Sequence, residues 1–405
     1  MNASVDQRQP GMATGLSLLV PITLSTMAIV LLAPILPQLQ AEFKDVPNAD
    51  YLVPVILTLP ALCVAIFSPI AGIFGDYFGR RRLLLWSLAL YGVVGPLPIF
   101  LNDIKLILMS RVVVGITEAL IMTLTTTLIA DYYRGEVRNK WLAAQTATAS
   151  LSALLFFNIG GLLGTFGWRM PFWVYTSSFV MLIAVLIFTW EPEQRTEEGG
   201  KEHAAHSMSW ASFPWLKMGG IIMVTIFASV LFYTVQIQAA PGLVAHGLSD
   251  SARIGFLTSV ASLGVPFGTF VYSRINKLPV GGLLFMEFFI LGVGFFMMSR
   301  AENSTWFLVG CGLNQIGAGM ILPTLLVWAV SQLAFEVRAR GAGIWQSAFA
   351  LGQFLSPIVV TFISLRVGGL LPSFQYLGVG GLVAAVCAMV MLINSKRQAT
   401  AKEIA

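Results

Sequence analysis

The feature that most limits how this chain can fold is a series of long apolar stretches that recurs along its whole length. A helix needs roughly 20 mostly apolar residues to cross the hydrocarbon core of a bilayer. On that criterion the sequence predicts twelve membrane-spanning helices, at residues 14–36, 51–71, 83–101, 106–130, 141–164, 171–190, 216–239, 251–273, 280–299, 305–330, 341–366 and 374–394. Only 11% of the residues are charged, about half the share in a soluble domain. We therefore expect an all-α membrane protein.

One hydrophilic segment interrupts this pattern. Residues 191–215 contain several acidic side chains beside Gly199-Gly200, a composition typical of a linker. The segment separates residues 1–190, with six predicted spans, from residues 216–405, with the other six. We expect an N-terminal half, a linker and a C-terminal half.

The loop charges predict the orientation of the spans. An even number of spans places both termini on one side, and loops that face the cytoplasm carry an excess of Lys and Arg. The side of the termini holds, among others, Arg80, Arg81, Arg82, Arg134, Arg138, Lys140, Arg274, Lys277, Arg338 and Lys396. The opposite loops hold only Lys44, Lys105, Arg169, Arg253, Arg300 and Arg366. Both termini and the linker are therefore expected in the cytoplasm.

The two halves share short sequence patterns. Glu136-Val137-Arg138 follows the fourth span, and Glu336-Val337-Arg338 follows the tenth. Gln145 in the fifth span has a counterpart in Gln346 of the eleventh. Matches at about the same offset predict two six-helix half-repeats.

A glycine- and charge-rich motif lies between the second and third spans, Gly72-Ile-Phe-Gly75-Asp76-Tyr-Phe-Gly79-Arg80-Arg81-Arg82. The glycines permit a tight turn and close helix approach, and Asp76 could accept hydrogen bonds from a helix N-terminus. The motif resembles the signature G-x-x-x-D-R-x-G-R-R of the major facilitator superfamily, with Tyr77 in place of an arginine. Ala33-Pro34-Ile35-Leu36-Pro37 also resembles bacterial drug/proton antiporters of this superfamily.

This resemblance extends over essentially the whole chain and implies the twelve-helix fold of that superfamily in a bacterial inner membrane. It further implies a conformational latch at one end of the bundle, in which Asp76 faces the start of the eleventh span and Arg80 pairs with Asp131. The latch would comprise Gly72, Asp76, Gly79, Arg80 and Asp131. The alternative is that these charges only fix the topology.

Two charged residues lie inside the fourth span, in Arg111-Val-Val-Val-Gly115-Ile-Thr-Glu118. A charge at mid-bilayer costs ~2.5–3.5 kcal/mol on insertion scales and is a functional hypothesis by default. Seven residues are about two helical turns, so both side chains share one face. The segment resembles proton-coupled and spinster-like or organic-anion members of the superfamily. We expect Arg111 and Glu118 to couple protons to transport; the alternative is a static buried pair. Glu287, in the peripheral ninth span, is expected to be locally paired or to reach toward the interface.

Polar side chains on the spans that surround the central cavity in the resembled fold are candidates for binding a substrate. They are Ser25, Thr26, Gln145, Asn158, Tyr233, Gln236, Asn314, Gln315 and Gln346. Amides, hydroxyls and aromatic rings with a single Arg–Glu pair suit a moderately apolar or amphipathic compound, or a carboxylate. A polyanion would call for several buried cations.

We accordingly expect a transporter that works as a monomer by alternating access, exporting an amphipathic or drug-like compound in exchange for protons. The alternatives are a proton symporter for an organic acid and a spinster-like amphiphile transporter, because Asn158-Ile-Gly160-Gly161 lacks the proline typical of antiporters in the fifth span. No histidine lies in a predicted span, so neither an enzyme nor a metal site is expected. We expect no cofactor and no nucleic-acid partner.

Overall fold

The computed structural model describes residues 10–192, 213–333 and 337–404, and this part of the chain contains twelve helical stretches long and apolar enough to cross a membrane. Each predicted span coincides with one of them. Most of the predicted linker, together with Glu336 of the repeated Glu-Val-Arg pattern, lies outside the described residues.

Prolines divide the first span into short helices. Pro21 and Pro34 lie in the 3-10 turns Val20–Ile22 and Ala33–Ile35, which join α1 (Met12–Leu19), α2 (Thr23–Val30) and α3 (Leu36–Glu42). Because proline lacks an N–H group, it interrupts the hydrogen-bond ladder of an α-helix. The first span therefore consists of three short α-helices joined by 3-10 turns.

The remaining spans are mostly single long helices. In the N-terminal half they are α4 (Ala49–Phe78), α5 (Arg80–Val94, followed by the 3-10 turn Leu97–Ile99), α6 (Ile104–Tyr132), α7 (Gly135–Gly164) and α8 (Ser178–Phe188, preceded by the 3-10 stretch Met170–Ser177). In the C-terminal half they are α10 (Trp215–Ala245), α11 (Ser251–Ser262) with α12 (Gly264–Ile275), α13 (Val280–Ser299), α14 (Ser304–Ser331), α15 (Arg338–Val367) and α16 (Leu370–Ile404).

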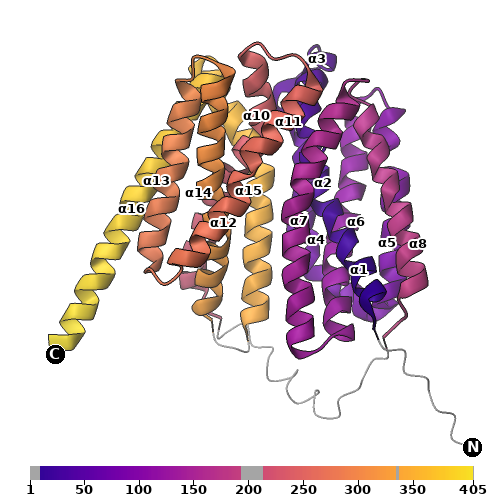
Figure 1. Ribbon diagram of the computed structural model, residues 1–405, viewed down its shortest axis with the longest axis horizontal. Helices are drawn as coiled ribbons and strands as arrows, with labels where there is room; N and C mark the ends of the chain where they lie inside the picture. Colours follow the sequence, from indigo (N-terminus) through magenta and orange to yellow (C-terminus); the bar gives the residue numbers. More distant parts are fainter. Residues whose placement is uncertain (1–9, 193–212, 334–336, 405) are drawn as a thin grey trace, which may run out of the picture.

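The two halves stand side by side (Figure 1). Most buried apolar side chains belong to two clusters, one drawn from the N-terminal half together with Ile237 of α10 and the other from the C-terminal half. Figure 1 places the start of α1 and the end of α16 at the same end of the bundle. This end includes the turn at Gly79 and is called the Gly79 end; the opposite end, where α7 stops, is called the Gly164 end.

The halves pack closely toward the Gly164 end. Gln38 Nε2 donates hydrogen bonds to Ser251 Oγ at 2.6 Å and to the Gly164 carbonyl at 2.9 Å. Gly161 of α7 lies against Gly255 of α11, where a Cβ on either residue would overlap the backbone of the other helix. Glycines at a crossing let two helix backbones approach closely, so this end of the interface is tightly closed.

Candidate functional site

The polar motif at residues 72–82 is helical except for a one-residue turn. Helix α4 continues to Phe78 and α5 begins at Arg80, so Gly79 alone separates them. Its φ of 89° and ψ of 126° lie in a region that side chains disfavour. The predicted span ends at residue 71, but the helix itself continues to Phe78.

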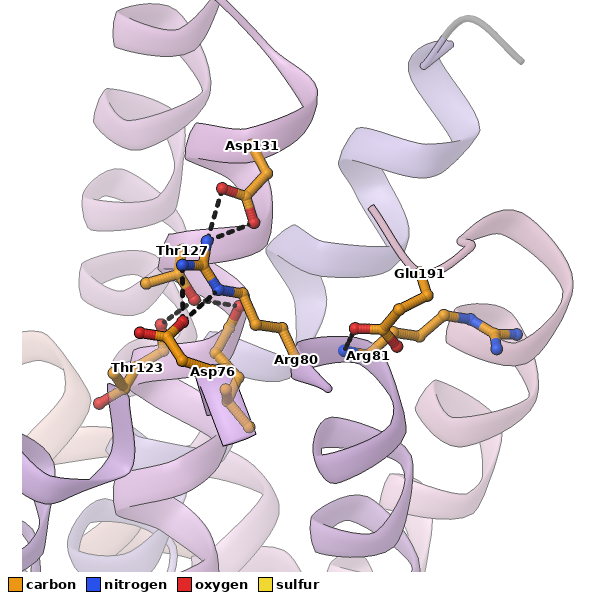
Figure 2. A network of polar contacts seen from close by, with 8 residues as sticks. Asp76, Arg80, Arg81, Thr123, Thr127, Asp131 and Glu191 are labelled. Carbon is orange, nitrogen blue, oxygen red and sulfur yellow. Dashed lines mark hydrogen bonds and ion pairs between the residues drawn. The ribbon is translucent and has the colours of Figure 1, made fainter. Parts of the chain in front are cut away.

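Arg80 is the centre of a charge cluster at this turn (Figure 2). Its Nη1 donates to both carboxylate oxygens of Asp131 at 2.6 Å, and its Nε and Nη2 donate to Asp76 Oδ1 at 3.0 and 2.8 Å. The planar guanidinium group can serve two carboxylates at once. Arg80 thereby joins the end of α4 to the end of α6, and Figure 2 shows Thr123 and Thr127 of α6 beside the pair.

Glu191 is a member of this site that the sequence analysis missed. Its Oε1 and Oε2 accept hydrogen bonds from the backbone N–H groups of Arg81 and Arg82, both at 3.1 Å, and so cap the N-terminus of α5. The N-terminus of α5 is thus capped by a residue that follows α8, a contact separate from the one expected between Asp76 and the eleventh span. A carboxylate at a helix N-terminus is favourable because unpaired N–H groups and the helix dipole converge there.

Further contacts fix the segment that carries Glu191. Arg81 donates from Nε to Thr189 Oγ1 at 3.1 Å and from Nη2 to the Leu186 carbonyl at 2.9 Å. The Tyr132 hydroxyl hydrogen-bonds the backbone of Trp190. The ends of α4, α5, α6 and α8 are therefore connected at the Gly79 end through side chains of both charges.

Arg111 lies fully buried in the N-terminal half. Its Nη2 donates to the Gly95 carbonyl at 2.7 Å, and its Nε contacts Ser110 Oγ at 3.3 Å. The guanidinium carbon lies 4.9 Å from the centre of the Tyr175 ring and 5.2 Å from that of Phe172, within the range of cation–π attraction. Backbone and rings therefore stabilise this cation without a carboxylate in direct contact.

Glu118 lies on the same helix with 4% of its surface exposed. None of the ion pairs between described residues joins it to Arg111, and its Oε2 atom has no hydrogen-bond partner. Tyr233 of α10, in the other half, lies near enough for the two groups to interact electrostatically. The next residue, Ala119, shares a small buried apolar cluster with Val64 of α4 and Ala350 of α15. Glu118 thus lies where α6 approaches the C-terminal half.

The predicted binding residues of the N-terminal half make contacts mainly within that half. The Thr26 hydroxyl reaches the Ala149 carbonyl of α7 at 3.3 Å, whereas that of Ser25 donates to the Ile22 carbonyl of the preceding 3-10 turn. Gln145 is buried and accepts a hydrogen bond from Thr126 of α6 at 3.1 Å. Asn158 is exposed, and its amide donates to the Leu154 carbonyl.

The predicted binding residues of the C-terminal half differ in their surroundings. Asn314 is fully buried and donates to the Leu291 carbonyl of α13 at 3.1 Å, so it faces the neighbouring helix of its own half. Gln315 is also fully buried, but its Oε1 has no hydrogen-bond partner among the described residues. Gln236 is buried, and Tyr233 and Gln346 are half-buried.

An aromatic cluster adjoins Gln315. The Phe349 ring lies 5.8 Å from that of Phe232, 5.7 Å from that of Tyr233 and 5.6 Å from that of Trp345, centre to centre. Gln315 Nε2 contacts the Phe232 carbonyl at 3.5 Å, and the buried Trp345 Nε1 has no hydrogen-bond partner. Buried polar atoms are usually paired, so unpaired ones beside aromatic surface could bond a ligand. Within the described residues, no group of three or more His, Cys, Asp or Glu side chains could hold a metal ion.

Comparison with known proteins agrees with this architecture. The family model described as Major Facilitator Superfamily matches residues 18–334. The chain is 26% identical to the tetracycline resistance protein, class D, of Salmonella ordonez, over 85% of this chain and 88% of that protein. It is 21% identical to the quinolone resistance protein NorA of Staphylococcus aureus, over 94% of this chain and 96% of that protein.

A solved structure shows the same fold. The crystal structure of a D-xylose–proton symporter matches with a TM-score of 0.77 and 16% identity, covering 93% of this chain and 96% of that one. The matched family model and the twelve apolar helices together identify the family. The chain belongs to the major facilitator superfamily of membrane transporters.

Proposed function

We propose that this transporter exports an amphipathic or drug-like organic compound in exchange for protons, by alternating access. The observation that carries the proposal is the buried carboxyl group of Glu118, which lies between the halves, with one oxygen unpartnered and no ion pair to Arg111. The names of the two bacterial relatives refer to tetracycline and quinolone resistance, which supports export of a drug-like compound.

Glu118 is suited to bind and release a proton. Burial disfavours the charged form of a carboxyl group, whereas a nearby cation stabilises it. Arg111 is held by the Gly95 carbonyl and two aromatic rings, so it can remain in place in either protonation state of Glu118. A change in the surroundings of Glu118 as the halves move would then change its affinity for a proton, and substrate and proton would alternate.

The substrate-binding surface we propose is the aromatic cluster of Phe232, Tyr233, Trp345 and Phe349, together with Gln315. Aromatic rings bind apolar and planar compounds. The free Trp345 N–H would donate a hydrogen bond to the compound, and the free Gln315 carbonyl oxygen would accept one. This set fits a planar amphipathic molecule that carries both an acceptor and a donor.

The arrangement of contacts supports a state closed at the Gly164 end. Gln38 bridges to Ser251 there, and the Thr361 hydroxyl bonds the Asp50 carbonyl across the halves at 3.2 Å. We assign this end to the outer side of a bacterial inner membrane and the Gly79 end, with both termini, to the cytoplasm. The Asp76–Arg80–Asp131 cluster would then act as a latch when the cytoplasmic side closes, with Gly72 and Gly79 shaping its two helices.

Purified protein in liposomes tests the direction and coupling of transport. A thermal-shift screen of tetracyclines, quinolones, organic acids and amphiphiles first identifies a ligand. We then expect a proton gradient to drive that ligand in the direction opposite to proton flow, detected together by ligand accumulation and a pH-sensitive dye inside the liposomes. Movement of ligand and protons in the same direction would establish symport and overturn the proposal.

A further inference from the structure

Glu287 of α13 is a second fully buried carboxyl group, remote in sequence from Arg111 and Glu118. It lies about 10 Å along the helix axis from the start of α13 at Val280, by the rise of an α-helix. None of the ion pairs in the described part of the chain involves it. Of the two alternatives expected for Glu287, the structure favours local pairing, because the side chain is fully buried and hydrogen-bonded to Thr324 of α14.

The immediate partner of Glu287 is a hydroxyl group. Thr324 of α14 hydrogen-bonds Glu287 Oε1, and the other oxygen, Oε2, has no partner. Tyr272 of α12 also interacts electrostatically with Glu287. Arg274, on the same helix, is exposed, and its guanidinium carbon lies 4.8 Å from the centre of the Phe270 ring. Cys387 of α16 is likewise exposed.

The contacts of Thr324 fit a neutral Glu287 better than an ionised one. The Thr324 hydroxyl also lies 3.1 Å from the Met320 carbonyl, but it has a single hydrogen to donate. If Glu287 carries a proton, it donates that proton to Thr324 Oγ1, and Thr324 donates its own hydrogen to Met320. If Glu287 is ionised, Thr324 must turn to the carboxylate, and a buried charge is left without a cation, which is costly.

The site lies where α14 is interrupted. Pro323 precedes Thr324 inside the helix and provides no N–H group for the Gly319 carbonyl. That carbonyl accepts a hydrogen bond from Thr269 of α12 at 3.0 Å instead. Proline-interrupted helices bend readily, so the turn of α14 that touches Glu287 is also the turn best able to move.

We propose that Glu287, with Thr324 as its hydrogen-bond partner, is a second proton-binding site, placed in the C-terminal half between α13 and α14. The site holds its proton while α14 is packed against α13 as in this structure. Release leaves the carboxylate to accept the hydrogen of Thr324 and requires the contact between the two helices to open to water. The site is independent of Glu118 and of the direction of transport.

Infrared difference spectroscopy of the full-length protein in lipid, between acidic and alkaline pH, tests the site directly. A protonated carboxyl group has a C=O stretching band that disappears when the proton leaves. We expect Glu287→Gln to remove one component of this band, and Thr324→Val to shift the position of that component because its hydrogen-bond partner is lost. Thr324→Ser should leave it in place, and so should Glu118→Gln and the exposed control Glu302→Gln.

Two results would overturn the proposal. In the first, Glu287→Gln leaves the carboxyl band as in the unmodified protein, which would mean that Glu287 is ionised. In the second, the part of the carboxyl band that belongs to Glu287 persists at every pH at which the protein remains folded, which would mean that Glu287 is a permanently neutral structural group. Thr324→Val changes no charge and keeps the side-chain shape, so it provides a readout even if Glu287→Gln folds poorly. Transport is not measured, so failure here is distinct from failure of the Glu118 proposal.

Discussion

At the scale of single residues, Gly79 meets two demands that only glycine satisfies. Its φ of 89° favours a residue without a side chain, and a Cβ there would lie 3.2 Å from Glu191 Oε1. The same absence of a side chain lets α4 turn directly into α5 and lets Glu191 reach the first N–H groups of α5. One residue thus shapes both the turn and its cap.

We expect Gly79→Ala to destabilise the protein by about 1–3 kcal/mol, the usual cost of a strained backbone conformation. Thermal unfolding in detergent should show a lower midpoint. Gly219→Ala is the matched control, because Gly219 lies within α10 and a Cβ there would meet nothing within 4 Å. Equal midpoints for the two variants would contradict the role given to Gly79.

Residue-scale contacts could be predicted only where a family pattern exists. The resemblance implied the pair of Arg80 and Asp131, and the structure contains that contact. The cap formed by Glu191 was not foreseeable from pattern alone, because its partners at Arg81 and Arg82 lie far away in the sequence. The usable signal was an acidic side chain directly after an apolar span. The unpaired atoms of Gln315 and Trp345 depend on packing, which no periodicity in the sequence records.

At the scale of helices, hydropathy located every span but not every helix end. Span 280–299 coincides with α13, whereas α4 runs past residue 71 to Phe78 and α7 begins at Gly135 rather than 141. A window of apolar residues detects the part of a helix inside lipid. The ends that enter water are polar and are held by caps and ion pairs, which hydropathy does not measure.

The crossing of α7 and α11 gives a prediction at this scale. A Cβ at Gly255 would clash with the Phe157 carbonyl and with Gly161, so Gly255→Ala should wedge the Gly164 end apart. Spin labels can be attached at Thr165→Cys and Arg253→Cys in a background without native cysteines. Double electron–electron resonance should then give a longer distance between the two labels with Gly255→Ala than without it.

Gly219→Ala is the control for this experiment, since a Cβ at Gly219 meets nothing within 4 Å. It should leave the distance between the labels unchanged. An unchanged distance in the Gly255 variant as well would mean that the close approach of α7 and α11 does not hold this end closed.

At the scale of the whole molecule, the distribution of basic residues predicts which end of the bundle faces the cytoplasm. Green fluorescent protein fused after the C-terminus should fluoresce, and alkaline phosphatase fused at the same place should be inactive, because the C-terminus is expected in the cytoplasm. A fusion after Leu248, in the connection between α10 and α11 at the Gly164 end, should show the reverse. An active phosphatase at the C-terminus would invert the proposed topology.

The whole-molecule architecture was the part most open to prediction. The number of spans follows from apolar length, because lipid admits few structures other than helices for such segments, and the half-repeat predicted the division into halves. The superfamily fold itself was implied by the resemblance of the Gly72–Arg82 motif. The closure at the Gly164 end was not predictable, because contacts such as Gln38 with Ser251 depend on how side chains pack across the halves, which hydropathy does not measure.

The most direct test of the central claim is proton-driven transport by Glu118→Gln in liposomes. Glutamine keeps the shape of the side chain but cannot exchange a proton. We expect this variant to bind the compound and to exchange it for itself across the membrane, but to lose its accumulation under a proton gradient. Glu42→Gln, an exposed carboxyl at the Gly164 end, should retain that accumulation. Undiminished gradient-driven accumulation by Glu118→Gln would contradict proton coupling through this residue.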